Sequence, residues 1–221
     1  MSEAHPGTRL PERFRAVIFD MDGLLLDTEL IWHRTEVALF QRHGGAFGWD
    51  DKMRVIGTDF AFTGRYFAER LGLPPEAGPG LVEEMAAIMR DELRREVDHR
   101  PGAVELVARL RGRTRLALAS NSTRDLVDAA LATAGVGDAF EVIVTSDDVE
   151  RPKPAPDLYR LACERLGVSP AEALALEDSA SGIAAAKAAG LTCYAVSQFA
   201  ETDVSAADRV VDSLEELLAE A

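Results

Sequence analysis

Cysteine and histidine are scarce in this chain of 221 residues. The two cysteines, Cys163 and Cys193, lie far apart, and the four histidines form no cluster with them or with one another. This number and spacing argue against a disulfide framework and against a structural zinc site. We therefore expect a protein of a reducing compartment, the cytoplasm.

Positive charge is also in short supply. The chain has 24 Lys+Arg against 38 Asp+Glu, which gives a formal net charge of −14. DNA, RNA and anionic membranes are bound through basic faces, so the composition argues against each of them as a partner. One small anion is compatible with this charge, because a phosphate pocket needs only a few oriented N–H groups and one or two cations.

Long apolar runs are missing as well. No stretch approaches the ~18 apolar residues of a membrane span, and the polar residues 1–12 have no apolar core of the signal-peptide type. The length fits one large domain, or one domain with a sizeable insertion. The 47% of hydrophobic residues is ordinary for a folded chain. We expect a soluble monomer.

What the chain does contain is a series of short apolar runs, each ending at polar side chains. Such runs are typical of strands that are buried on both faces of a parallel sheet. They cover residues 16–19, 116–119, 142–144, 173–176 and 192–196. Helical patterns lie between the later runs, over residues 102–111, 123–134, 156–166 and 180–189. This alternation predicts an α/β fold with an open, doubly wound parallel sheet of the Rossmann-like kind.

One segment breaks the alternation. Residues 29–97 carry helical patterns, clearest over 29–43 and 81–97, and no convincing strand. Glycine and proline turn signals divide the segment. We interpret it as an all-helical cap inserted after the first strand. Residues 1–28 and 98–221 would then form the α/β core domain, with hinges near residues 27–28 and 99–101.

Polar side chains follow the predicted strands at their carboxyl ends. They are Asp20 and Asp22 after the first strand, Ser120 and Asn121 after the second, Lys153 in the loop after the third, and Glu177 and Asp178 after the fourth. Ligands of open α/β sheets bind beyond these ends. We therefore expect the whole set to meet at one rim of the sheet.

The acidic members of this set predict a metal site. Asp20, Asp22, Glu177 and Asp178 would bring four carboxyl groups together, and uncompensated they would repel one another. Oxygen ligands, retained waters and a substrate phosphate are the usual surroundings of Mg²⁺. We predict Mg²⁺ at these residues, with Asp22 offering its backbone carbonyl. Taken alone, Asp20 is equally well explained as a turn or cap residue.

The remaining residues of the set, Lys153, Ser120 and Asn121, are of types that bind an anion. Lys153 is one of three lysines in a chain with 21 arginines, and it stands between two prolines. A lysine in a stiffened loop is typical of a compact charge placed on an anion. Ser120 and Asn121 alone would suggest a helix N-cap, but at a strand end they also offer a hydroxyl and N–H groups to phosphate. The set predicts phosphoryl transfer through an aspartyl phosphate.

Four segments resemble the motifs of the haloacid dehalogenase superfamily. They are Phe-Asp-Met-Asp-Gly-Leu-Leu-Leu-Asp-Thr-Glu at 19–29, Ala-Ser-Asn-Ser at 119–122, Arg-Pro-Lys-Pro-Ala-Pro at 151–156, and Leu-Glu-Asp-Ser-Ala-Ser-Gly-Ile at 176–183 with Ala-Ala-Gly at 188–190. The resemblance spans essentially the whole chain, and its first and fourth motifs are the most specific. The helical insertion resembles the first cap type of the superfamily.

The resemblance implies a role for each residue. Asp20 would attack phosphorus and bind Mg²⁺, and Asp22 would protonate the leaving oxygen and then deprotonate the attacking water. Asp178 would bind Mg²⁺, with Glu177 supporting it or acting through water. The phosphoryl oxygens would be held by Ser120 and Lys153. An acid at Asp22 fits the phosphatases and phosphomutases of the superfamily and departs from its dehalogenases.

We therefore predict a Mg²⁺-dependent phosphatase of a small phosphorylated metabolite, a sugar or polyol phosphate. The alternative is a hexose phosphomutase resembling β-phosphoglucomutase, but Trp32 stands where that group has a histidine, and Ile56-Gly57 and Phe60 stand where it has basic cap residues. A phospho-receiver module would share the sheet, the acids and the lysine, but Asp22 and the helical insertion argue against it. A catalytically inactive relative is disfavoured by the intact residue set. Specificity would be set by the cap, whose polar candidates are Arg54, Thr58, Asp59 and Arg65. Taken singly, each of them is better explained as a surface residue.

Overall fold

Six strands form one parallel sheet in the computed structural model, which describes residues 9–56, 58–196 and 202–221. The strands are β1 (Ala16–Phe19), β2 (Arg115–Ala119), β3 (Val142–Val144), β4 (Ala173–Glu177), β5 (Thr192–Ala195) and β6 (Arg209–Val210). Their spatial order is β3-β2-β1-β4-β5-β6, and every neighbouring pair is parallel. The predicted doubly wound α/β fold is confirmed. The order reverses between β1 and β4, which is the switch point where such sheets bind ligands.

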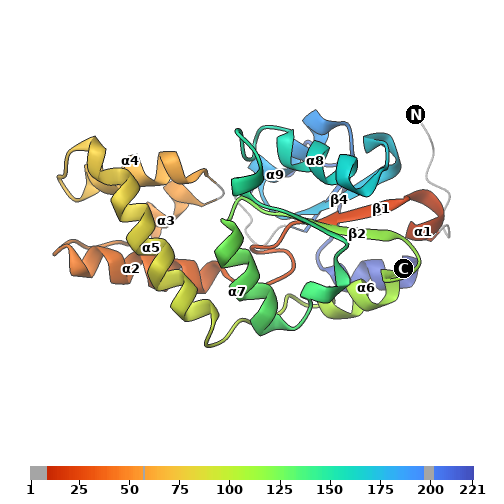
Figure 1. Cartoon of the computed structure of the whole chain (residues 1–221), viewed down its shortest axis with the longest axis horizontal. Helices are drawn as coiled ribbons and strands as arrows, with labels where there is room; N and C mark the ends of the chain where they lie inside the picture. Colours follow the sequence, from red (N-terminus) through yellow and green to blue (C-terminus); the bar gives the residue numbers. More distant parts are fainter. Residues whose placement is uncertain (1–8, 57, 197–201) are drawn as a thin grey trace.

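Helices cover both faces of the sheet (Figure 1). One face packs against α6 (Ala103–Leu110), α7 (Arg124–Ala134) and the 3₁₀-helix η5 (Leu214–Glu220), and the other against α8 (Asp157–Leu166) and α9 (Ala180–Ala189). The side chains of β1 alternate between the two faces of the sheet, because successive side chains of a strand point to opposite sides. Val17 and Phe19 join the first layer, and Ala16 and Ile18 join the second.

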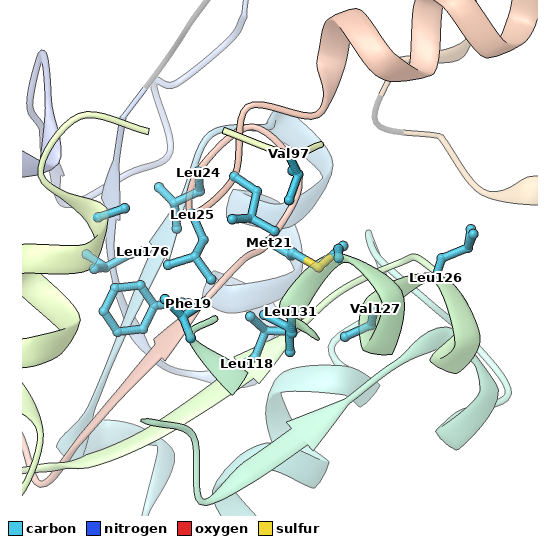
Figure 2. Close-up of a cluster of buried hydrophobic side chains, with 14 of the residues drawn as sticks. Phe19, Met21, Leu24, Leu25, Val97, Leu118, Leu126, Val127, Leu131 and Leu176 are labelled. Atoms are coloured by element: carbon cyan, nitrogen blue, oxygen red, sulfur yellow. The ribbon is translucent and has the colours of Figure 1, made fainter. Parts of the chain in front are cut away.

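The first layer forms the larger part of the hydrophobic core. Figure 2 shows Phe19 of β1 and Leu118 of β2 lying near Leu131 of α7. The sheet interior is apolar, so polar groups on β1 and β4 are confined to the strand ends, where Asp20 follows β1 and Glu177 closes β4. The short elements outside these layers are α1 (Leu10–Arg13), η1 (Pro75–Ala77), η2 (Gly137–Ala139), η3 (Ser146–Asp148) and η4 (Pro170–Glu172).

The sequence prediction missed the edge strand β6. This strand has two residues, and one of them is Arg209, so it forms no apolar run that a sequence pattern could detect.

The ends of three helices were visible in the sequence as glycines. Gly135, Gly167 and Gly190 follow α7, α8 and α9 in the left-handed region, with φ of 69°, 65° and 93°. Glycine adopts this conformation without steric cost, which is why it stops helices.

Four α-helices occupy the described residues between β1 and α6, in addition to η1. They are α2 (Glu29–Arg42), α3 (Trp49–Val55), α4 (Phe60–Arg70) and α5 (Gly78–Leu93). Figure 1 shows them together at one end of the molecule, opposite the end that carries α1 and the C-terminus. Their interior is aromatic, with the Phe40 ring 5.0 Å from that of Phe47 and 5.2 Å from that of Phe67, measured between centroids. Among the described residues, no helix combines the length and the apolar character that a bilayer crossing needs.

The chain enters and leaves these helices through two paired segments. Leu26 and His99 form an antiparallel bridge, and the Asp27 N–H donates to the Asp98 carbonyl at 2.8 Å. These are the neighbourhoods in which the sequence suggested hinges. The domain limits at residues 28/29 and 97/98, and hinge motion itself, stay predictions. An ion pair between Arg90 of α5 and Asp125 of α7 adds a second contact between the cap helices and the core.

Candidate functional site

A cavity of about 510 Å³ lies between the carboxyl ends of the sheet and the cap helices. Its core side includes five of the predicted site residues, namely Asp20, Asp22, Asn121, Lys153 and Asp178. Its cap side is supplied by α2, α3 and α4, with Met85 from α5. Residues far apart in sequence therefore meet at one rim, as the strand-end argument predicted.

Lys153 is the central cation of the core side. Its ammonium contacts the Asp20 carboxylate, lies 2.6 Å from Oε1 of Glu177, and donates to the Ala119 carbonyl at 2.8 Å. Burial alone would lower the pKa of Lys153, but the two carboxylates outweigh it and raise that pKa above its ordinary value. The side chain is therefore held as a buried, charged ammonium beside Asp20.

Glu177 is the second carboxylate that holds Lys153 in place. It is fully buried, and its Oε1 also accepts a hydrogen bond of 2.5 Å from the Tyr159 hydroxyl. Its Oε2 accepts from the Asp178 N–H and the Ser179 hydroxyl, both at 3.2 Å. Glu177 thus has partners on both oxygens. Sequence reasoning missed Tyr159, because an aromatic residue on the buried face of a helix reads as core packing.

Three carboxylates are close enough to share a cation. Oxygens of Asp20, Glu177 and Asp178 lie within 4.8 Å of one another. Burial raises the pKa of Asp20 to about 8 despite Lys153, and burial together with Asp20 and Glu177 raises the pKa of Asp178 well above its ordinary value. One lysine does not compensate this cluster. An all-oxygen donor set with uncompensated negative charge fits Mg²⁺.

Asp22 joins the core to the cap. Its Oδ1 accepts hydrogen bonds from the Thr28 hydroxyl at 2.7 Å and the Trp32 indole at 3.0 Å. Its Oδ2 accepts from the Ser122 hydroxyl at 2.9 Å and the Ser120 hydroxyl at 3.3 Å. Trp32, which the sequence singled out only as a replaced histidine, is therefore a partner of the candidate general acid.

The two predicted phosphate-binding residues after β2 have other side-chain partners. Ser120 is fully buried and donates to Asp22, while Ser122 lines the cavity. The Asn121 side chain donates to the Lys153 carbonyl at 3.1 Å and accepts from the Lys153 N–H at 2.8 Å. Asn121 thus fixes the backbone that carries Lys153, and a phosphate contact from Asn121 would fall to its main chain.

The cap side of the cavity contains a cation that sequence reasoning missed. Lys52 is 3% exposed, and its ammonium lies 3.1 Å from Oε2 of Glu29 and 3.3 Å from Oε1 of Glu36. A signal was available, because two of the three lysines in an arginine-rich chain line the same cavity.

The structure places the four polar cap residues suggested by the sequence in different surroundings. Thr58 lines the cavity. Asp59 instead caps α4 by accepting from the Phe62 N–H at 2.7 Å. Arg54 and Arg65 are exposed. Of these four residues, Thr58 alone lines the cavity that contains Asp20 and Lys153.

We expect Gly182→Ala to lower kcat/KM at least about tenfold, which corresponds to about 1.4 kcal/mol. A Cβ at Gly182 would lie 2.0 Å from the Glu177 carboxylate. Glu177 is held by Tyr159 and Lys153, so the clash would displace the ammonium beside Asp20. Steady-state kinetics with p-nitrophenyl phosphate would measure the loss. Gly80→Ala is the control, because it also lies in a helix but has open space around its Cβ. Equal activity of both variants would contradict this account.

Comparisons with known proteins agree with this geometry. Residues 14–190 match a family model described as haloacid dehalogenase-like hydrolase. The chain is 38% identical over 187 residues to YhcW of Bacillus subtilis (strain 168), covering 82% of this chain and 83% of YhcW. It is 31% identical over 182 residues to the fructose-1-phosphate phosphatase YqaB of Escherichia coli (strain K12), covering 81% of this chain and 95% of YqaB.

Solved structures of CbbY from Rhodobacter sphaeroides share the fold. The complex with phosphate has a TM-score of 0.83 and 31% identity, and a variant in complex with xylulose-(1,5)bisphosphate has 0.82 and 29%. Each alignment covers 92% of this chain and 96% of CbbY. The family model covers most of the chain, and the relatives align over nearly their full length. This chain therefore belongs to the haloacid dehalogenase-like hydrolases.

Proposed function

We propose that this hydrolase is a Mg²⁺-dependent phosphatase that cleaves a sugar or polyol phosphate through an aspartyl phosphate on Asp20. The observation that carries the proposal is the contact of Asp20 with the Lys153 ammonium at the floor of a cavity, with Asp22 two residues away. A nucleophile, an anion-binding cation and a candidate proton donor thereby face one volume. A cytoplasmic location and a monomeric state belong to the same proposal.

Of the two carboxylates after β1, Asp20 acts as the nucleophile and Asp22 transfers protons. A carboxylate oxygen of Asp20 forms a bond to phosphorus while the bond from phosphorus to the leaving oxygen breaks. Asp22, protonated at that moment, gives its proton to the leaving oxygen. The Asp22 carboxylate then accepts a proton from water as that water attacks phosphorus. Inorganic phosphate is released, and the Asp20 carboxylate is regenerated.

The neighbours of these carboxylates position the phosphoryl group. Lys153 offers a fixed positive charge to the phosphoryl oxygens. Ser122 lines the cavity, and its hydroxyl, which donates to Asp22 in this structure, would become a second donor by turning to the phosphoryl group. Asp20 and Asp178 would hold Mg²⁺, with Glu177 and the Asp22 carbonyl as further ligands. Bound Mg²⁺ would offset carboxylate charge and stabilise charge on the phosphoryl oxygens.

The interactions of Asp22 tie its position to that of the cap. Thr28 and Trp32 both hold Oδ1 of Asp22, and they stand at the start of the helical segment. A movement of α2 relative to the sheet would therefore change which partners Asp22 has. Such a movement would also close the cavity over the reacting groups and exclude bulk water.

Hydrolysis should depend on the metal. We expect p-nitrophenyl phosphate turnover to be lost in excess EDTA and restored by Mg²⁺. Ca²⁺ should inhibit, because it takes more oxygen ligands at longer distances and loosens in-line geometry. Tight binding of phosphate-shaped metallofluorides would give an independent readout. Full activity in excess EDTA would contradict the metal assignment.

The choice between phosphatase and mutase needs a separate measurement. A mutase must keep the phosphoenzyme from water and grip a second phosphate, which calls for cations in the cap. The buried cap cation Lys52 is offset by Glu29 and Glu36, which supports hydrolysis. The test supplies glucose 1-phosphate with catalytic glucose 1,6-bisphosphate and follows glucose 6-phosphate and inorganic phosphate. Isomerisation much faster than phosphate release would overturn the phosphatase assignment.

A further inference from the structure

Lys52, Glu29 and Glu36 form a charged cluster on the cap side of the cavity, which we call the cap triad. All three line the same cavity as Asp20 and Lys153. Their side chains are 4%, 13% and 4% exposed, in that order. Glu29 and Glu36 lie two turns apart on α2, so they share one helix face, and Lys52 reaches them from α3. The mechanism described above gives these residues no task.

The cap triad has unused hydrogen-bonding capacity. Oε2 of Glu36 is buried and has no hydrogen-bond partner among the described residues, whereas Oε2 of Glu29 is buried with the Lys52 ammonium 3.1 Å away. Nδ1 of His33 lies 4.0 Å from Oε2 of Glu36, and burial and Lys52 lower the pKa of His33, which favours its neutral form. Buried acceptors are almost always satisfied in folded proteins. The open acceptor of Glu36 lies in a residue that lines the cavity, so a hydroxyl group of a bound ligand could donate to it.

The surroundings of the cap triad are apolar. Trp32, Val55, Phe60 and Met85 line the same cavity, and the rings of Trp32 and Phe60 lie 6.1 Å apart between centroids. Apolar walls with a few placed polar groups are typical of small-molecule sites of about 300–1,000 Å³. Carbon–hydrogen faces of a sugar or polyol fit such walls, while its hydroxyls reach the carboxylates.

The charge of the cap triad is unsuited to a second anion. Two carboxylates face one ammonium, so the fully ionised cluster carries a net charge of −1 in formal terms. Burial raises the pKa of Glu36 to about 7, with Lys52 acting in the opposite direction, and burial likewise raises the pKa of Glu29. Protonation of one glutamate makes the cluster neutral and turns that carboxyl into a donor. Neither form leaves a spare cation for a carboxylate or a second phosphate.

We propose that the cap triad is the subsite for the leaving group and selects substrates whose leaving group is uncharged and carries several hydroxyls. Hydroxyl groups would donate to Glu29 and Glu36 and accept from Lys52. Polyol and sugar monophosphates fit this chemistry, whereas sugar bisphosphates and phosphorylated carboxylic acids place negative charge against the carboxylates. The inference rests on the proposed function, because it assigns the group that Asp22 protonates.

The first test uses the wild-type enzyme with Mg²⁺. We expect kcat/KM for glucitol 6-phosphate or fructose 1-phosphate to exceed that for fructose 1,6-bisphosphate and for phosphoglycolate at least tenfold. Comparable or higher values for the bisphosphate or for phosphoglycolate would overturn the proposal. Absence of p-nitrophenyl phosphate hydrolysis would instead count against the proposed function. In that case binding is ranked by calorimetry with the same compounds, and a preference for bisphosphate or phosphoglycolate still overturns the assignment of the cap triad.

The second test uses variants. Glu36→Gln keeps the shape and removes the charge, and we expect the ratio of kcat/KM for glucitol 6-phosphate to that for p-nitrophenyl phosphate to fall at least tenfold. Discrimination against fructose 1,6-bisphosphate should weaken in the same variant. Glu84→Gln is the matched control, because Glu84 pairs with Arg42 and His43 elsewhere on the cap. Unchanged ratios in Glu36→Gln, or equal changes in both variants, would overturn the proposal. If Glu36→Gln does not fold, the wild-type ranking still decides.

Discussion

Asp20→Asn should abolish phosphate release, with kcat lower by roughly 10⁴-fold or more, as for the loss of a catalytic nucleophile. An amide is a poor nucleophile, and it cannot form the aspartyl phosphate. The substitution also removes one of the three carboxylates that would hold Mg²⁺. Single-turnover and steady-state assays with p-nitrophenyl phosphate would measure the loss. Wild-type turnover in this variant would refute the mechanism.

The loss of activity must be separated from loss of fold. Asp20 stands beside Glu177 and Asp178 with Lys153 as the nearby cation, so replacing its charge relieves repulsion as well as removing an ion pair. We therefore expect Asp20→Asn without Mg²⁺ to melt no lower than the wild type. Asp128→Asn is the matched control on an exposed face of α7, and it should retain full activity.

Much of the fold could be predicted because strands that are buried on both faces of a sheet appear in the sequence as continuous apolar runs. Strands β1 and β4 are continuous apolar runs, and their buried patterns match the segments inferred from the sequence. Strand β6 is no such run, because its two residues lie at the edge of the sheet and neither is fully buried. Helices α3 and α4 were anticipated only as unspecified helical pattern, because their apolar faces pack on other cap helices that the sequence does not position.

The candidate site was predictable only in part, for a related reason. Polar residues at strand ends are conspicuous, so Asp20 and Lys153 could be named from the sequence. Glu177 and Asn121, which hold Lys153, could be named in the same way, but the aromatic partners of the polar set could not. From the sequence, Tyr159 is expected in the core, and Trp32 is notable only as the residue that replaces a histidine. The tertiary structure brings Tyr159 to Glu177 and Trp32 to Asp22.

The cap triad illustrates the same limit for charge. Lys52 reads as a solvated residue of a short helix, although it is 3% exposed in the structure. Its position beside Glu29 and Glu36 of α2 depends on the tertiary structure, which no local pattern specifies. The rarity of lysine in this chain set both Lys52 and Lys153 apart from the many arginines, whereas Lys153 was also marked by its two flanking prolines.

Lys153→Ala should lower kcat/KM by about 2–4 kcal/mol, the scale of removing one electrostatic stabiliser from a catalytic site. It should also lower stability, because Glu177 would stay buried without its cation and the Ala119 carbonyl would lose its donor. Breaking a buried ion pair from one side costs about 3–5 kcal/mol. Lys187→Ala is the control, because Lys187 pairs with a partly exposed Asp208. Its activity should be that of the wild type.

Lys153→Arg distinguishes charge from shape at this position. The ammonium lies among Asp20, Glu177 and the Ala119 carbonyl, and 5.2 Å from the centroid of the Tyr159 ring. A planar guanidinium keeps the charge but needs more room and directs its donors differently. We therefore expect Lys153→Arg to recover stability better than activity, with kcat/KM remaining at least about tenfold below wild type. Denaturant titration and steady-state kinetics would measure the two separately. Full recovery of kcat/KM by arginine would mean that positive charge alone suffices, and that the compact ammonium held by Glu177 has no special part in binding the phosphoryl group.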